Sequence, residues 1–175
     1  MADSVVDACC VINLYAAGDL ANICPALGLT LHIPTKVREE ALFLRRIQES
    51  EVVLEPIDLT PAVEAGLLHI CTLEASELAL SVQLAVELDD GEATALAIAK
   101  SRGWIVATDD RKARRIADGL GVTALTTPEL MKRWADNAAA TSTEIAAALR
   151  RVRDLASFVP RKGSPVYPWW TKHLD

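Results

Sequence analysis

Hydrophobic and polar positions along this chain alternate between two patterns. Short apolar runs of strand length separate longer stretches in which apolar residues return at helical spacing. The runs predicted as strands are 5–7, 29–33, 52–57, 104–108 and 122–125. The stretches predicted as helices are 9–17, 20–28, 35–48 with Thr35 as N-cap, 61–66, 75–88, 91–102, 111–119, one with Thr127 as N-cap and Pro128 as its first residue, and 141–158. Residues 67–73 fit either a strand or a connector.

Strands that alternate with helices of this length predict an α/β fold. Such βαβ units have right-handed crossovers and build a parallel sheet, so we expect a three-layer α/β/α sandwich around a central, mainly parallel sheet. With 175 residues the chain is long enough for one full hydrophobic core. We expect residues 1–135 to form the α/β body, and residues 136–175 to form an extra C-terminal helix and tail packed on it.

The tail from Pro160 to Asp175 has a different composition. It contains three prolines and the adjacent Trp169 and Trp170, so it is predicted to be irregular. Adjacent tryptophans in such a tail usually dock on an apolar surface. We expect them to dock on the body or on a second copy, in preference to stacking on nucleic-acid bases.

Composition excludes a membrane protein. No apolar run reaches the roughly 18 residues that a membrane span needs, and the start of the chain lacks the basic region of a signal peptide. The four cysteines show neither a CxxC motif nor metal-ligand spacing with histidine, so we expect buried, reduced thiols in a cytoplasmic protein. His32 and His69 fall in apolar runs and are expected to be core or strand residues.

The net charge of −6 hides an uneven distribution. Residues 1–100 carry 5 Lys and Arg against 16 Asp and Glu, whereas residues 101–175 carry 13 against 8. A basic C-terminal part beside an acidic site suits a protein that holds a polyanion. The ordinary alternative is that these charges lie on solvated helix faces.

Acids follow two of the predicted strands directly. Asp7 ends the first, Asp109 and Asp110 end the fourth, and Glu92 opens a helix between them. The carboxyl ends of neighbouring parallel strands meet in one crevice, and carboxylates gathered there repel unless a cation or a shared proton compensates them. Oxygen ligands favour Mg²⁺ or Mn²⁺ over Zn²⁺, so the pattern predicts a metal-dependent enzyme site.

Each acid also has an ordinary structural explanation. Asp110 could cap the helix that follows, and Glu92 could favour a first helical turn. Asp7 is harder to explain in this way, because a carboxylate at a buried strand end needs a compensating partner. We expect Asn13 to be an ordinary polar helix residue.

Four segments in order resemble a known family. They are Val5-Val6-Asp7-Ala8 with Ile12-Asn13-Leu14, Pro34-Thr35-Lys36-Val37-Arg38-Glu39-Glu40, Asp90-Gly91-Glu92-Ala93-Thr94-Ala95-Leu96-Ala97, and Ala107-Thr108-Asp109-Asp110-Arg111. Over residues 4–130 their order and spacing are similar to those of PIN-domain ribonucleases, the fold of VapC-type toxins. Each segment alone is a weak signal, and the set is more specific.

The resemblance implies roles for particular residues. It makes Asp7, Glu40, Glu92 and Asp110 the catalytic acids, and Asp7, Glu92, Asp109 and Asp110 ligands of Mg²⁺ or Mn²⁺. Cys9 stands where the family usually has Ser, Thr or Asn, so this chain lacks a good hydrogen-bond donor there.

Basic residues follow the last of these acids. Arg111, Lys112, Arg114 and Arg115 are expected to contact an RNA backbone, or else to form a solvated helix face.

The resemblance implies a metal-dependent endoribonuclease, the toxin of a type II toxin–antitoxin module, with RNA as substrate, a cognate antitoxin and a homodimeric state. The alternative is a weak or inactive PIN-fold module that binds nucleic acid or protein. A receiver domain would need an acceptor aspartate and a lysine that this chain lacks at those positions, and Asp7-Ala8-Cys9 argues against a dehalogenase-like phosphatase, which needs Asp-x-Asp.

Overall fold

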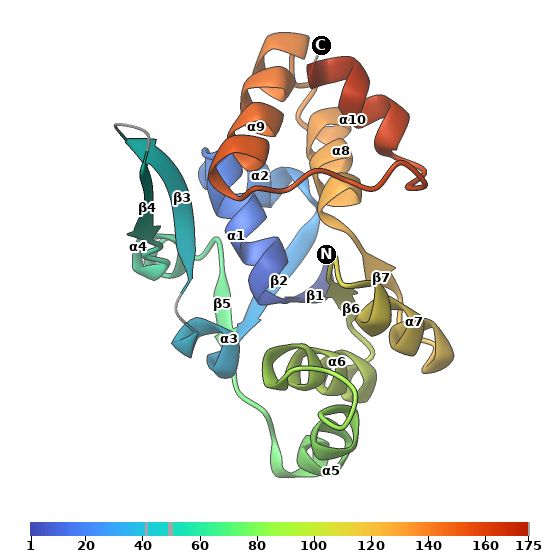
Figure 1. The fold of residues 1–175 in the computed structure, drawn as a ribbon. Coiled ribbons are helices and arrows are strands. Elements are labelled where there is room, and N and C mark those ends of the chain that lie inside the picture. The colour runs from blue at the N-terminus through green and yellow to red at the C-terminus, as the bar shows by residue number, and fades with distance from the viewer. Residues whose placement is uncertain (41, 49–50, 175) are drawn as a thin grey trace.

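A five-stranded parallel sheet forms the centre of the molecule (Figure 1). The computed structural model describes residues 1–40, 42–48 and 51–174. Within them the strand order is β5-β2-β1-β6-β7, and each neighbouring pair is parallel. The strands are β1 (Ala2–Val6), β2 (Leu29–Pro34), β5 (His69–Cys71), β6 (Ile105–Ala107) and β7 (Ala124–Leu125).

Helices cover both faces of this sheet. Successive strand residues point to opposite faces, so Val5 belongs to one buried cluster and Val6 to the other. On the Val6 side pack α1 (Ala8–Ala17), α2 (Leu20–Ala26), α8 (Thr127–Asn137) and α9 (Ser142–Leu155). On the Val5 side pack α5 (Ala75–Leu84), α6 (Asp90–Arg102) and α7 (Arg111–Gly119). The predicted three-layer α/β/α sandwich is therefore confirmed.

Small side chains on α6 are buried on more than one side of the helix, because it packs between the sheet and its neighbouring helices. Ala93, Ala95, Ala97 and Ala99 are all fully buried. Gly103 ends the helix in the left-handed conformation, as its position after the last apolar residue indicates. The buried body of α6 thus holds its first turn, which carries Glu92, next to the sheet.

The helix predicted over 35–48 is wrong beyond its first turns. Among the described residues of this stretch only α3 (Thr35–Glu39) is helical, and its N-cap is Pro34, not Thr35. Residues 43–48 form β3 (Phe43–Gln48), which pairs antiparallel with β4 (Glu51–Pro56) in a separate two-stranded sheet. The strand predicted near 52–57 exists, but it lies outside the central sheet, and the linking residues 41, 49 and 50 fall outside the described part. A short helix, α4 (Thr60–Glu64), follows.

The tail is more ordered than its composition predicts. After α9 an irregular segment leads into α10 (Tyr167–Leu174), where Pro168 is tolerated in the first turn. Trp170 is fully buried in the cluster on the Val6 side, and the ring of Phe158 meets it edge-on at 5.9 Å. The expectation that a tryptophan of the tail docks on the body is met at Trp170.

Two smaller expectations are also corrected. The N-cap of α8 is Thr126, one residue before the Thr127 cap that the sequence predicts, and its side chain forms a reciprocal capping box with Glu129. Cys9 is exposed, whereas the other three cysteines are buried, and all four are free. In the described residues, no helix has the length and apolar character to cross a membrane.

Candidate active site

The carboxyl ends of β1 and β6 lie side by side and bring the first and last predicted acids together. Val6 pairs with Ala107 across the two strands, and the Asp7 amide donates to the Ala107 carbonyl at 3.0 Å. Asp109 and Asp110 follow β6 immediately. The strand-end argument therefore places these acids correctly, at one edge of the sheet.

Asp7 is buried, with 3% of its surface exposed. It is the N-cap of α1, and its Oδ1 accepts a hydrogen bond from the Cys10 amide at 2.8 Å. Burial raises the pKa of its carboxyl to about 6, and the nearby charge of Asp109 adds to this, although the hydrogen bonds from Thr108 and Cys10 oppose it. A nearby cation would stabilise the ionised form of this carboxyl.

Glu92 lies in the first turn of α6, which packs on the Val5 side of the sheet. Its amide donates to Oδ1 of Asp89 at 2.8 Å, which makes Asp89 the cap of this helix. Partial burial raises the pKa of Glu92 to about 7, with further contributions from the charges of Asp89, Asp110 and Asp7. Asp7 and Glu92 line one narrow pocket together with Thr108 and apolar side chains of α6, β6 and α7, so the two acids lie close to one another.

Asp110 caps a helix and belongs to the acidic group at the same time. Its Oδ1 accepts hydrogen bonds from the amides of Lys112 at 2.7 Å and Ala113 at 2.8 Å, in the first turn of α7. Among the described residues its Oδ2 accepts no hydrogen bond from the protein. The ordinary explanation as a helix cap is thus correct for one oxygen and leaves the other for a ligand.

Asp109 has a different environment, because both of its oxygens accept hydrogen bonds from the protein. Oδ1 accepts from the amide of Thr127 at 2.9 Å, and Oδ2 accepts from Nδ2 of Asn13 at 3.0 Å and from the Thr127 hydroxyl at 2.5 Å. Burial raises the pKa of Asp109, and these hydrogen bonds oppose the rise. Asp109 therefore ties α1 and the start of α8 to the end of β6.

Asn13 and Thr127 were not predicted as parts of the site. Asn13 is 3% exposed and donates to both Asp109 and the Thr127 hydroxyl, the latter at 3.0 Å. It is thus more than the ordinary polar helix residue that we expected. An amide on the buried face of an otherwise apolar helix was the available signal, because buried polar side chains need partners.

Glu40 lies at the end of α3 and approaches the first turn of α6. A Cβ atom at Gly91 would collide with Glu40 Oε1, so any other residue there would push the carboxylate out of this position. Partial burial raises the pKa of Glu40, as do the charges of Asp89 and Asp90, whereas Lys36 lowers it. Asp89, an acid that was not predicted as part of the site, is near both Glu40 and Glu92 and raises the pKa of each. Glu40 itself does not line the pocket of Asp7 and Glu92.

Asp7, Glu92, Asp109 and Asp110 together are called the acidic edge below, and their chemistry fits a hard cation. Every candidate ligand is a carboxylate oxygen, which suits Mg²⁺ or Mn²⁺. Yet within residues 1–40, 42–48 and 51–174, no group of three or more His, Cys, Asp or Glu side chains is arranged as a ready metal site. Carboxylates repel one another in the absence of a cation, so such a site is expected to tighten around its ion.

Cys9 lies at the exposed border of the acidic group. Desolvation of its thiol, followed by the charges of Asp7 and Asp109, raises its pKa to about 12. The side chain is therefore a neutral thiol near neutral pH.

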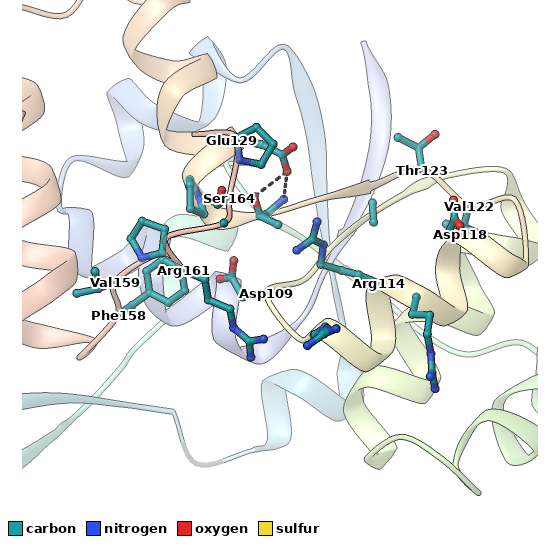
Figure 2. Close-up of a pocket in the computed structure, with 18 of the residues that line it drawn as sticks. Asp109, Arg114, Asp118, Val122, Thr123, Glu129, Phe158, Val159, Arg161 and Ser164 are labelled. Atoms are coloured by element: carbon teal, nitrogen blue, oxygen red, sulfur yellow. Dashed lines mark hydrogen bonds between the residues drawn. The ribbon is translucent and has the colours of Figure 1, made fainter. Parts of the chain in front are cut away.

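The basic residues of α7 divide into two groups. Arg111, Arg114 and Arg115 line a groove that Asp109 also lines (Figure 2). Lys112 instead turns toward the end of α5, where its Nζ donates to the Glu87 carbonyl at 2.6 Å and lies 3.6 Å from the Glu87 carboxylate. Three of the four predicted nucleic-acid contacts thus share one surface next to the acids.

Comparison with known proteins gives one family match. A family model described as a PIN domain matches residues 3–162, which is nearly the whole chain. No curated protein matches the sequence.

Proposed function

The chain belongs to the PIN-domain family, and from this premise we propose that it is a metal-dependent endoribonuclease that hydrolyses RNA phosphodiester bonds. PIN domains are generally nucleases, so hydrolysis of nucleic acid is the chemistry expected of the family. One observation carries the proposal for this chain. Asp7 and Glu92 line one narrow pocket, and burial together with neighbouring acids raises the pKa of each.

The residues divide the proposed work between them. Asp7, Glu92 and Asp110 would hold one or two Mg²⁺ or Mn²⁺ ions. When bound, such ions activate a water and compensate charge on the phosphate. Asp109 is the fourth acid of the proposed metal set, and its hydrogen bonds to Asn13 and Thr127 hold it in place.

Two further groups would act on the substrate. Glu40 extends the acidic edge along the start of α6 as the remaining catalytic acid. Arg111, Arg114 and Arg115 would hold phosphates beside the acids, and Lys112 would contribute to the local positive charge.

The similarity of the motifs to VapC-type toxins supports a more specific biological role. We propose that this protein is the toxin of a type II toxin–antitoxin module, acting on RNA in the cytoplasm as a homodimer. A cognate antitoxin would then cover the acidic edge and block it.

A second candidate function is a PIN-fold module that binds nucleic acid or a protein with little or no catalysis. Cys9 supports it, because a thiol replaces the better hydrogen-bond donor that the family usually has beside the first acid. Under this alternative the groove binds RNA while the acids cleave nothing.

Cleavage of a single-stranded RNA of mixed sequence separates the two candidates. We expect cleavage in millimolar Mn²⁺, none in excess EDTA, and a loss of at least about 100-fold in Glu92→Gln, because that change removes an ion ligand. Glu64→Gln, which removes an exposed acid of α4, is the matched control and should cleave as the wild type does. Equal cleavage by Glu92→Gln and the wild type would contradict the proposal, and a DNA strand of the same sequence tests the preference for RNA.

A further inference from the structure

A groove of about 1100 Å³ lies along α7 and β7 and includes Asp109 in its lining, and the chain segment after α9 closes its other side (Figure 2). This segment, residues 158–165, is called the C-terminal wall below. In Figure 2, Arg114 of α7 and Arg161 of the C-terminal wall lie on opposite sides of Asp109. The groove is thus continuous with the acidic edge, although residues far apart in the sequence build its two sides.

Arginines from both sides make the groove basic. Arg111, Arg114 and Arg115 line it from α7, and Arg161 lines it from the C-terminal wall. Within the described part of the chain, neither Arg111, Arg114 nor Arg161 forms an ion pair, and Arg115 lies 3.9 Å from Glu87.

Three acids, Asp109, Asp118 and Glu129, also line the groove, so its four arginines leave an excess of one positive charge. Glu129 accepts hydrogen bonds from the amide and the hydroxyl of Thr126 at 2.7 and 2.6 Å, and Asp109 is bonded to Asn13 and Thr127. Only Asp118, near the end of α7, has no such partner among the described residues.

The C-terminal wall is held firmly in place. Pro160 and Val166 are buried, and Phe158 packs against Trp170, which anchors α10 in the core. A turn follows, in which the Ser164 amide donates to the Arg161 carbonyl at 2.9 Å. Arg161 itself is exposed, so a fixed backbone presents a free guanidinium to the groove.

We infer that the groove binds a single RNA strand next to the phosphate that is cut, and that Arg161 contacts its backbone from the C-terminal wall. The inference rests on the proposed function, since it takes RNA as the substrate of the acidic edge. It gives the segment after α9 a direct part in substrate binding.

The two kinds of lining side chain match the two parts of a single strand. Arginines pair with phosphates, and apolar side chains of the wall such as Phe158, Val159 and Pro165 offer surface to unpaired bases. Binding of this kind depends on salt, because each neutralised phosphate releases counterions.

Fluorescence anisotropy with a labelled single-stranded RNA of about twelve nucleotides tests the inference. The test compares the wild type with Arg161→Gln and Lys162→Gln, in EDTA so that no RNA is cut. Lys162 is the matched control, because it is the exposed basic neighbour of Arg161 and does not line the groove. For Arg161→Gln we expect a Kd raised several-fold and a salt slope of log K lowered by about 0.7, the value for one phosphate on a single strand. Lys162→Gln should change neither.

The outcomes separate this inference from the proposed function. If Arg161→Gln binds RNA as the wild type does, or if both variants weaken binding equally, the inference is overturned. It is also overturned if the wild type binds no RNA even at low salt, as expected if the groove serves an acidic partner protein. If Arg161→Gln alone weakens binding while the wild type cleaves no RNA in Mn²⁺, the inference that the groove binds RNA is supported and the nuclease proposal fails. Equal melting temperatures of the three proteins exclude a folding defect.

Discussion

At the scale of single residues, the acidic edge combines two demands on the same side chains. Asp7 caps α1 through one oxygen, which stabilises the fold. Its burial also makes the charged form costly, which destabilises the metal-free protein near neutral pH. Residues at functional sites often show this conflict between stability and activity.

Asp7 gives the stability of the metal-free protein a defined pH dependence. Its pKa is 3.8 ordinarily and about 6 in the folded protein, so between about pH 4 and 6 the folded state binds more protons than the unfolded state. Stability from this group is therefore full below that window and falls as the pH rises through it. A shift of about two units corresponds to about 3 kcal/mol.

Asp7→Asn removes this charge and can still accept the hydrogen bond from Cys10. In EDTA we expect the variant to be about 1–3 kcal/mol more stable than the wild type at pH 8, with the difference shrinking towards pH 4. Urea unfolding at both pH values measures it. A variant that is less stable than the wild type at pH 8 would show that the carboxylate is compensated within the protein itself.

Gly91 is expected to position Glu40. Alanine should favour the helix by about 0.5–1 kcal/mol, yet its Cβ would displace the Glu40 carboxylate. We expect Gly91→Ala to keep or raise the melting temperature while RNA cleavage falls about 10-fold, a size known for residues that support a metal site. Gly119→Ala in α7 is the control for the helix effect alone, because a Cβ there would meet no atom of the described residues within 4 Å. Wild-type cleavage by Gly91→Ala would mean that the position of Glu40 is unimportant.

The sequence predicted the positions of some site residues and missed others for a physical reason. Asp7 and Asp110 follow strands, and the end of a strand in a parallel sheet has a predictable neighbour. Asn13 and Thr127 belong to the site only through contacts with Asp109, which for Asn13 span more than ninety residues of chain. The local pattern could show that Asn13 needs a partner, but it could not show that the partner is Asp109.

At the scale of elements, the helix predicted over 35–48 shows where hydrophobic periodicity fails. The rule assumes that apolar residues mark a buried face. In the β3–β4 hairpin, Ile47 pairs with Val52, and these residues are 80% and 53% exposed. Apolar side chains on an exposed hairpin therefore misled the prediction, whereas the buried strands β1, β2 and β6 were found.

The two tryptophans of α10 should differ sharply in their contribution to stability. Trp170 is fully buried, whereas Trp169 is half-buried beside His173. We expect Trp170→Ala to cost about 3–5 kcal/mol of unfolding free energy and Trp169→Ala less than half as much. Denaturant unfolding of both variants checks this. Equal losses would mean that α10 is held by its outer face as well.

At the scale of the whole molecule, the uneven charge of the sequence acquires a spatial meaning. The acids of β1, α6 and β6 meet at one edge of the sheet, and arginines of α7 and the C-terminal wall continue from it. Charge counts alone could not place them, because Lys112 belongs to the same basic run and faces Glu87 instead. The fold sorts these charges into a site for ions and a path for a polyanion.

The central claim is that these acids bind a divalent ion, and calorimetric titration of the purified protein with Mn²⁺ tests it most directly. The account predicts saturable binding to the wild type and its loss in Asp7→Asn, measured at pH 8, where Asp7 is ionised. Absence of binding at millimolar Mn²⁺, or equal binding by the two proteins, would contradict it.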